Sequence, residues 1–255
     1  MQLKNIPRYL GVILGIIKDE RCGFILLTKL GRYLVPRYKF SWPHLAWFDK
    51  PTLNEILARY GEKDGFNAHR RLMIGELMRL TPAVPGDTAE CGAYKGCGSH
   101  IILLAPPPHD VACPREHYVF DSFEGLSAPS PEDGNYWKKA DLRSGREIIE
   151  HNLSEFRNVH FMEGWIPKRF DEVKDRRFAF VHIDVDLYEP TRDAIAFFYE
   201  RLNPGAILIC DDYALYSCPG ATKAVDDFLM DKPEKMILLP GGGGFFIKGV
   251  LSAKE

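Results

Sequence analysis

Two stretches of this chain, Phe180-Val-His-Ile-Asp-Val-Asp-Leu-Tyr-Glu-Pro-Thr191 and Ile207-Leu-Ile-Cys-Asp-Asp-Tyr213, share one pattern. In each, an apolar run rich in β-branched residues ends in carboxylates. Such a run is typical of a buried strand in a parallel sheet, whose C-terminal edge carries the site. Two acidic strand ends side by side would concentrate negative charge in one crevice, which requires a cation or a proton. The two stretches therefore predict a metal site in an enzyme.

Strands and helices alternate on both sides of these stretches, from Pro85 onward. The expected strands are 88–93, 118–121, 159–162, 178–184, 206–211, 236–239 and 245–248. The expected helices are 69–80, 98–105, 144–156, 190–202 and 220–231. This alternation predicts right-handed βαβ units and a mostly parallel, Rossmann-like sheet of seven strands. The linker between the last two strands, Pro240-Gly-Gly-Gly-Gly244, is too short for a crossover, so an antiparallel hairpin is expected at the end of the sheet.

Bulk composition limits the function classes. The 255 residues suffice for one α/β domain with an appendage, and a net charge of −2 argues against nucleic-acid binding. The six cysteines form no CxxC pair, which favours reduced thiols in a cytoplasmic protein over disulfides or a zinc site. We expect a helical N-terminal extension over residues 1–65 and the main domain over residues 66–255.

Residues 1–40 are rich in lysine and arginine, with an apolar run at 9–17 that is too short to span a bilayer. The favoured interpretation is a helical extension that packs on the main domain or on a second subunit of a homo-oligomer. The alternative is peripheral contact with an anionic membrane, which would make the protein membrane-associated. Residues 40–56 are expected to be a connecting segment.

The stretch Thr88-Ala-Glu-Cys-Gly-Ala-Tyr-Lys-Gly-Cys-Gly-Ser99 predicts a strand, a glycine-rich turn and the start of a helix. The next strand, 118–121, ends in Asp121, where nucleotide-binding folds place the carboxylate that holds the ribose hydroxyls. Phe123, Glu163 and Trp165 could then flank an adenine, although both aromatic residues could equally belong to the core and Asp121 could cap a helix. The candidate cofactor-binding residues are Glu90, Gly92, Tyr94, Gly96, Ser99, Asp121, Ser122, Phe123, Glu163, Gly164, Trp165 and Asp184.

These residues indicate an adenosine-containing cofactor, either a nicotinamide dinucleotide or S-adenosylmethionine. The glycine spacing differs from the GxGxxG dinucleotide fingerprint. The carboxylate of Glu90 would repel a pyrophosphate, whereas it suits the ammonium and sulfonium groups of S-adenosylmethionine.

Four motifs together resemble the TylF/macrocin O-methyltransferase family. They are Val84-Pro-Gly-Asp-Thr-Ala-Glu-Cys-Gly-Ala-Tyr-Lys-Gly96, Phe120-Asp-Ser-Phe-Glu-Gly-Leu126, His182-Ile-Asp-Val-Asp-Leu-Tyr-Glu-Pro-Thr191 and Asp211-Asp-Tyr213. The resemblance covers roughly residues 65–250. It implies a class I methyltransferase fold, S-adenosylmethionine as methyl donor, a bound Mg²⁺ or another hard divalent cation, and methylation of sugar hydroxyls.

The resemblance also implies roles for single residues. Asp184, Asp211 and Asp212 would bind the metal, and Asp186 would be the general base. In extended backbone Asp184 and Asp186 point to the same side, while Asp211 and Asp212 diverge unless the chain turns where the strand ends. His182 could point into the same cleft or be an ordinary buried histidine. Tyr188 and Tyr213 could line an acceptor pocket or only pack.

The leading hypothesis is a metal-dependent O-methyltransferase that acts on a sugar or on another small-molecule or glycan acceptor. A carboxylate is a weak base for a sugar hydroxyl, and a divalent cation would lower the pKa of the bound hydroxyl. The alternatives are an NAD-dependent oxidoreductase on a similar sheet and a non-catalytic module at the membrane surface.

Overall fold

The computed structural model describes residues 50–62, 66–105 and 115–251, together with residues 26, 27, 30, 31 and 47. Internal contacts divide the chain into two compact units, residues 1–54 and 55–255. Few residues of the first unit are described, so the predicted helical extension and the membrane contact expected of residues 1–40 lie almost wholly outside the described residues. None of the described helices has the length and hydropathy that crossing a bilayer would require.

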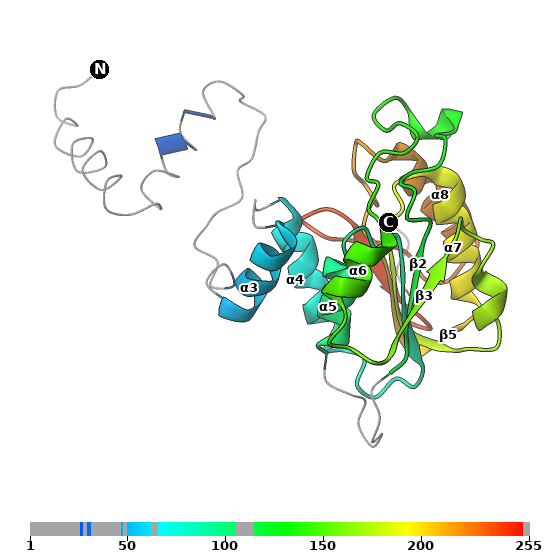
Figure 1. Ribbon diagram of the computed structural model, residues 1–255. Coiled ribbons are helices and arrows are strands. Elements are labelled where there is room, and N and C mark those ends of the chain that lie inside the picture. Colours follow the sequence, from blue (N-terminus) through cyan, green and yellow to red (C-terminus); the bar gives the residue numbers. More distant parts are fainter. Residues whose placement is uncertain are drawn as a thin grey trace, which may run out of the picture. The chain divides into compact units, whose positions relative to one another are not determined.

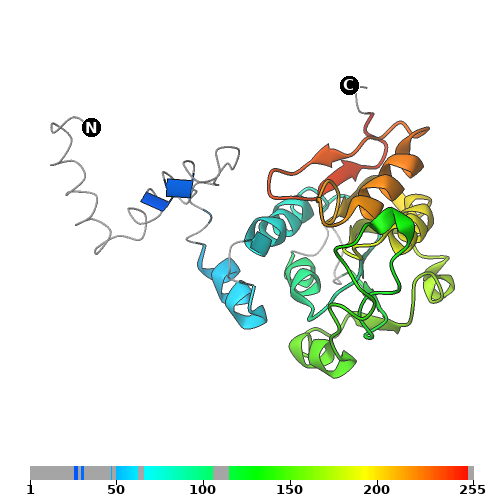
Figure 2. The same ribbon diagram turned by 90° about the horizontal axis from the view of Figure 1, so that it is seen from above.

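The second unit is built on a seven-stranded sheet with the order β3-β2-β1-β4-β5-β7-β6. The five strands at one side are parallel, and β7 is antiparallel to both of its neighbours. Figure 2 shows the C-terminal hairpin, coloured orange to red, at one edge of the sheet. The strands are β1 (Asp87–Cys91), β2 (His117–Asp121), β3 (Val159–Glu163), β4 (Phe178–Ile183), β5 (Leu202–Cys210), β6 (Ile237–Leu238) and β7 (Gly244–Ile247).

Helices cover both faces of this sheet (Figure 1). The helices α4 (Phe66–Met78), α5 (Cys97–Leu103) and α6 (Arg146–Asn152) lie on one face, and α7 (Tyr188–Tyr199) and α8 (Pro219–Leu229) lie on the other. Every residue of the central strand β4 is buried, as expected of a strand packed on both faces. The predicted α/β architecture with a mostly parallel sheet and a terminal antiparallel hairpin is therefore confirmed.

An aromatic cluster fills the layer between the sheet and α7. The ring of Phe198 meets those of Phe178 and Phe170 at centroid distances of 5.0 and 5.3 Å, both in edge-to-face geometry. Phe120 of β2 contacts Phe170 at 5.1 Å. Such pairs add to the stabilisation from burying apolar area. The cluster thus packs β2 and β4 against α7.

One helix was missed in the sequence. Part of the segment expected to be a connection is the helix α3 (Pro51–Tyr60). Pro51 is its first residue, a position where proline costs no hydrogen bond. From this helix Tyr60 contacts His100 of α5 with a hydroxyl-to-Nδ1 distance of 3.0 Å, and Arg59 pairs with Glu155. The end of α3 therefore packs within the second unit.

Candidate active site

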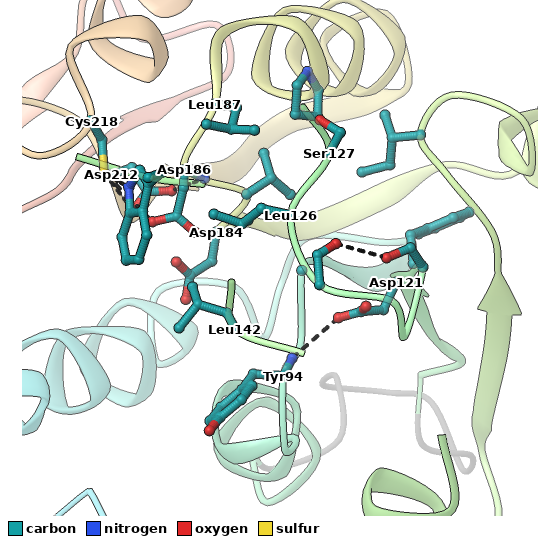
Figure 3. Close-up of a pocket in the computed structure, with 18 of the residues that line it drawn as sticks. Tyr94, Asp121, Leu126, Ser127, Leu142, Asp184, Asp186, Leu187, Asp212 and Cys218 are labelled. Atoms are coloured by element: carbon teal, nitrogen blue, oxygen red, sulfur yellow. Dashed lines mark hydrogen bonds between the residues drawn. The ribbon is translucent and has the colours of Figure 1, made fainter. Parts of the chain in front are cut away.

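A cavity of about 590 Å³ opens at the C-terminal edge of the parallel strands. Figure 3 shows its two ends, with Tyr94 and Asp121 at one and Asp184, Asp186, Asp212 and Cys218 at the other. The predicted site residues that line it are Gly92, Tyr94, Asp121, Ser122, Gly164, Trp165, Asp184, Asp186 and Asp212. Residues of both predicted groups, for the cofactor and for the metal, thus line one cavity, whereas Asp211 is buried outside the lining.

At the first end, Asp121 fixes the glycine-rich turn. One oxygen of its carboxylate accepts hydrogen bonds from the backbone amides of Ala93 and Tyr94 at 2.8 and 3.2 Å, and the other accepts one from Phe123 at 2.8 Å. Gly92 has a φ of 76°, and a Cβ there would lie 1.9 Å from the carbonyl oxygen of Asp184. Only glycine therefore lets the end of β1 approach the backbone that carries Asp184.

Glu90 and Ser99 are buried and absent from the lining of the cavity. The sequence suggested that Glu90 contacts the ammonium or sulfonium group of a cofactor, and this prediction is corrected, because its carboxylate does not reach the cavity. Glu90 is 1% exposed, and its carboxylate accepts a hydrogen bond from the Ser99 hydroxyl and lies 2.8 Å from Nδ1 of His182. This hydrogen-bonded series continues from the Ser99 hydroxyl to Nε2 of His117, at 2.9 Å. The carboxylate points beneath the cavity because Gly98 leaves room for it, since a Cβ there would lie 2.0 Å from its Oε1.

Three further candidates also lie outside the lining. Phe123 is 7% exposed and belongs to a small apolar cluster, so it is a core aromatic and the suggested adenine contact is corrected. The Glu163 carboxylate is half exposed and pairs with Arg146 at 2.8 Å. Gly96 is buried in the glycine-rich turn and lies against Ile149 of α6. These residues support the cavity from its rim or from below.

The second end is formed where β4 and β5 finish. β4 ends at Ile183, and Asp186 has a φ of 61°, so the backbone from Asp184 to Asp186 is not extended. The extended backbone assumed for these two residues is therefore not present, although both side chains line the same cavity. A turn also begins directly after Cys210, at the end of β5. This turn meets the condition under which Asp211 and Asp212 can approach one point.

Arg70 of α4 marks that point. Its Nη2 lies 3.3 Å from Asp184 Oδ1 and 3.6 Å from Asp212 Oδ1, and it forms an ion pair with Asp211 Oδ2. All three predicted metal ligands thus converge on one guanidinium nitrogen. Their oxygens are the hard donors that Mg²⁺ and related cations take, so the residues fit a hard divalent cation.

Two more basic groups flank the same carboxylates. Arg71 lies with Nη1 at 3.4 Å from Asp184 Oδ2 and 3.5 Å from Asp211 Oδ2, while Glu62 holds its Nε at 2.7 Å. On the sheet side, Nε2 of His182 lies 3.6 Å from Asp211 Oδ1. His182 is fully buried and does not line the cavity, so it supports Asp211 from below.

This charge distribution separates the aspartates by pKa. Burial alone would raise the pKa of Asp211, but Arg70, Arg71 and His182 hold it well below its usual range. Burial together with the charges of Asp211 and Asp212 raises the pKa of Asp184 to about 8. Burial together with Asp212 and Asp184 raises the pKa of Asp186 to about 9. One carboxylate, that of the buried Asp211, is therefore firmly ionised, whereas Asp184 and Asp186 both keep a proton near neutral pH.

Potential metal-binding atoms form two close groups within the described residues, each with atoms within 4.8 Å of one another. One group is His182, Asp184 and Asp211, and the other is Asp186, Asp212 and Cys218. Asp212 bridges them, since its Oδ2 accepts a hydrogen bond from the Asp186 amide at 2.7 Å while its Oδ1 faces Arg70. Asp211 therefore belongs to the first group, whereas Asp212 also contacts the second, although the two residues are adjacent in sequence.

The segment between β2 and α6 supplies an aromatic wall to the cavity. Trp137 donates its indole N–H to Cys218 Sγ at 3.3 Å, and that sulfur lies 3.5 Å from Asp186 Oδ1. Tyr136 meets Trp137 edge to face at 4.9 Å between ring centroids. The segment is tied down by the buried Asp133, whose Oδ1 accepts a hydrogen bond from the Tyr188 amide at 2.6 Å.

Several functional candidates were missed in the sequence. Arg70 and Arg71 carry no motif, and nothing in the sequence around them on α4 indicated that they reach the acidic strand ends. Trp137 and Cys218 likewise gave no signal. Tyr188 and Tyr213, suggested as acceptor contacts, do not line the cavity, and their hydroxyls lie near Asp227 and Asp226 on α8.

Comparison with known proteins shows which family this fold belongs to. The family model of macrocin O-methyltransferase (TylF) matches residues 74–237. A tetracenomycin rhamnosyl 4′-O-methyltransferase of Streptomyces olivaceus is 31% identical over 153 residues, which cover 56% of this chain and 58% of that protein. Mycinamicin III 3″-O-methyltransferase of Micromonospora griseorubida is 28% identical, covering 58% of this chain and 63% of that protein. The alignments thus span about three fifths of these relatives.

Solved structures show the same architecture. The O-methyltransferase NovP is 25% identical, with a TM-score of 0.57 over 71% of this chain and 80% of that chain. The calicheamicin methyltransferase CalS11 is 19% identical, with a TM-score of 0.65 over 89% of this chain and 93% of that chain, which shows a shared fold. The chain has the S-adenosylmethionine-dependent methyltransferase fold and belongs to the TylF/macrocin O-methyltransferase family.

Proposed function

We propose that this protein transfers a methyl group from S-adenosylmethionine to a hydroxyl of a sugar or glycosylated small molecule, with a divalent cation at the aspartate cluster. The observation that carries the proposal is the single cavity that joins the Asp121 end to the Asp186 end. Methyl transfer needs the donor and the acceptor oxygen held close together, and a cavity with these two ends can hold both. The NAD-dependent alternative loses its support, because the family is one of O-methyltransferases.

At the cofactor end, Asp121 would take the ribose hydroxyls with the lone pairs that its backbone bonds leave. Ser122, Tyr94, Gly164 and Trp165 line the same part of the cavity and would enclose the adenosyl and methionine groups. Glu90, Gly96, Ser99, Phe123 and Glu163 would act indirectly, through the turn and the helix that they hold in place.

At the acceptor end, Asp184, Asp211 and Asp212 would hold a Mg²⁺ or similar ion, since their oxygens converge on one point. The bound cation would lower the pKa of a sugar hydroxyl and stabilise the alkoxide. Asp186 would accept the hydroxyl proton; in the metal-free protein burial with Asp212 and Asp184 raises its pKa to about 9, and a bound cation would lower that pKa toward neutral. The sulfonium is already an activated leaving group, so no covalent enzyme intermediate is needed.

The wall of Tyr136, Trp137, Leu126 and Leu142 would receive the acceptor. Aromatic and apolar side chains favour the C–H face of a sugar ring or an aglycone. Two relatives methylate natural products, a rhamnosyl tetracenomycin and mycinamicin III, which supports a glycosylated natural product or sugar here. A cytoplasmic location, a homo-oligomer and peripheral membrane contact remain predictions from the sequence.

Calorimetry with S-adenosylhomocysteine, followed by a methyl-transfer assay on a panel of nucleotide sugars and glycosides, tests the proposal. We expect micromolar binding of S-adenosylhomocysteine, weakened by Asp121→Asn and unchanged by Asp171→Asn on the exposed surface. We also expect transfer that stops when EDTA removes the cation. Binding of NADH without binding of S-adenosylhomocysteine would refute the cofactor assignment, and transfer undiminished by EDTA would refute the metal.

A further inference from the structure

The guanidinium of Arg70 lies among the three carboxylates assigned to the metal. Its Nη2 is within 3.6 Å of an oxygen of Asp184, Asp211 and Asp212. The side chain of Arg70 is only 10% exposed, and those of Asp211 and Asp212 are 3% and 2% exposed. The arginine is thus buried in the cluster and is its nearest positive charge.

A metal ion and this guanidinium need the same oxygens. A divalent cation takes oxygen ligands at about 2.0–2.6 Å, whereas a guanidinium nitrogen lies about 2.7–2.9 Å from a carboxylate oxygen. Both cations on the same three oxygens would also repel each other strongly in a space with so little water. Only one of them can be held by all three carboxylates at a time.

The neighbouring Arg71 is placed differently. Its guanidinium contacts Asp184 and Asp211, but none of its nitrogens forms an ion pair with Asp212 among the described contacts. Glu62 faces it with Nε to Oε2 at 2.7 Å and Nη2 to Oε1 at 3.5 Å, which holds it at the edge of the cluster. Arg71 can therefore remain as a fixed charge while Arg70 is exchanged.

We propose that Arg70 is a built-in competitor for the divalent cation, holding the three aspartates together in the metal-free protein and leaving their oxygens when the metal binds. The inference rests on the metal part of the proposed function. It assigns Arg70 the role of a positioning residue that sets metal affinity. It also explains how three buried carboxylates can be assembled before a cation arrives, since an uncompensated cluster would be costly to bury.

Mn²⁺ binding tests the proposal. Calorimetry and the electron paramagnetic resonance signal of the free ion measure it for the unmodified full-length protein and for the variants Arg70→Gln, Arg70→Lys and Arg79→Gln. Arg79 follows the same helix, is 70% exposed and pairs only locally with Glu76 in the described contacts, so it is the matched control. We expect Arg70→Gln to bind Mn²⁺ about tenfold more tightly than the unmodified protein. Arg70→Lys should lie between them, and Arg79→Gln should equal the unmodified protein.

A second measurement needs no activity. Without metal, Arg70→Gln should melt at a lower temperature than the unmodified protein. Saturating Mn²⁺ should raise the melting temperature of Arg70→Gln by more than it raises that of the unmodified protein. Binding of S-adenosylhomocysteine at the other end of the cavity reports whether the variant is folded; if Arg70→Gln is not, Arg70→Lys carries the comparison.

The outcomes separate the two claims. If all variants bind Mn²⁺ with equal affinity, or Arg70→Gln binds it more weakly, Arg70 is not a competitor, although the metal assignment stands. If no variant binds a divalent cation while S-adenosylhomocysteine binds and methyl transfer proceeds, the metal part of the proposed function falls and this inference falls with it.

Discussion

The two groups of acidic residues at the ends of β4 and β5 have the same composition in carboxylates and opposite surroundings. Asp211 faces Arg70, Arg71 and His182, and its pKa lies well below the usual range. Asp186 faces Cys218 and the amide-bound carboxylate of Asp212, and its pKa rises to about 9. Asp211 therefore holds negative charge, whereas Asp186 holds a proton.

The difference has two causes: basic side chains lower the pKa of Asp211, whereas burial and the neighbouring carboxylates of Asp212 and Asp184 raise that of Asp186. The α4 helix brings two arginines to Asp211, whereas the start of α8 brings the neutral thiol of Cys218 to Asp186. A catalytic site that needs both a cation position and a base can obtain them from neighbouring carboxylates in this way. The following changes would break or sharpen the contrast, beginning with the largest effect.

The largest effect is expected for Asp184→Asn, beside the ionised Asp211. Loss of one of three oxygen donors should weaken the divalent cation and lower kcat/KM by on the order of 10³-fold. Steady-state methyl transfer measures this, and calorimetry should find S-adenosylhomocysteine bound within a few-fold of the unmodified protein. The control Asp231→Asn removes a carboxylate that is 77% exposed. Full activity of Asp184→Asn in EDTA would contradict the assignment.

The proton-holding group is tested by Asp186→Asn, which should lower kcat by about 10²-fold with little change in cofactor affinity. A base must be unprotonated to act, and a pKa raised to about 9 leaves most of Asp186 protonated at pH 7. The rate should therefore rise with pH up to about that value, and bound cation should shift the rise to lower pH. A pH profile of kcat tests this: a variant that keeps the same rise as the unmodified protein would show that another group is the base.

The aromatic wall beside Asp186 is tested by Trp137→Ala. Loss of the ring should raise KM for the acceptor by about tenfold, corresponding to about 1.4 kcal/mol, without changing S-adenosylhomocysteine binding. Trp137→Phe keeps an aromatic ring and removes only the hydrogen bond to Cys218, so it should show a smaller effect. Equal KM values for all three proteins would place the acceptor elsewhere in the cavity.

The smallest effect is expected on stability, through His182. Burial alone would lower its pKa, but the carboxylates of Asp211 and Glu90 raise it to about 10. A histidine with a folded pKa above its unfolded value stabilises fully below about pH 6.5, and this stabilisation is lost as the pH rises toward 10.

Urea unfolding of the metal-free protein between pH 6 and 10 measures this loss. The free energy of unfolding should fall by at most about 1.4 kcal/mol per pH unit from this one group. Asp184 and Asp186, with raised pKa values, act in the same direction over this range. His182→Gln should therefore show a shallower slope than the unmodified protein, and an unchanged slope would mean that His182 is neutral in the fold.

Much of the fold was predictable because its signals are local. The apolar runs of β4 and β5, the glycine-rich turn after β1 and the short linker before β7 each determine their own backbone. The helix α3 was missed because proline and tryptophan dominate the composition before it, and the strand boundaries shifted because the acids just after β4 and β5 lie in turns. The aspartates and Asp121 were predicted for the same local reason, since each directly follows or ends a strand.

The indirect roles of Glu90, Ser99 and Phe123 could not be predicted in the same way. Whether a side chain at a strand end points into the cavity or beneath it depends on the helix packed against it. Gly98 on α5 admits the Glu90 carboxylate, and Ala93 and Ile149 enclose Phe123. These contacts join segments that carry no shared pattern in the sequence.

The sequence by itself determined that acidic strand ends would meet at one edge of a parallel sheet and that this concentration of charge needs a cation or a proton. Only the tertiary structure decided how the need is met. Arg70 reaches Asp184 across 114 positions of the chain, and Trp137 reaches Cys218 across 81. Such contacts depend on how helices and loops pack on the finished sheet. The sequence alone therefore does not determine which carboxylates are ionised and which are protonated.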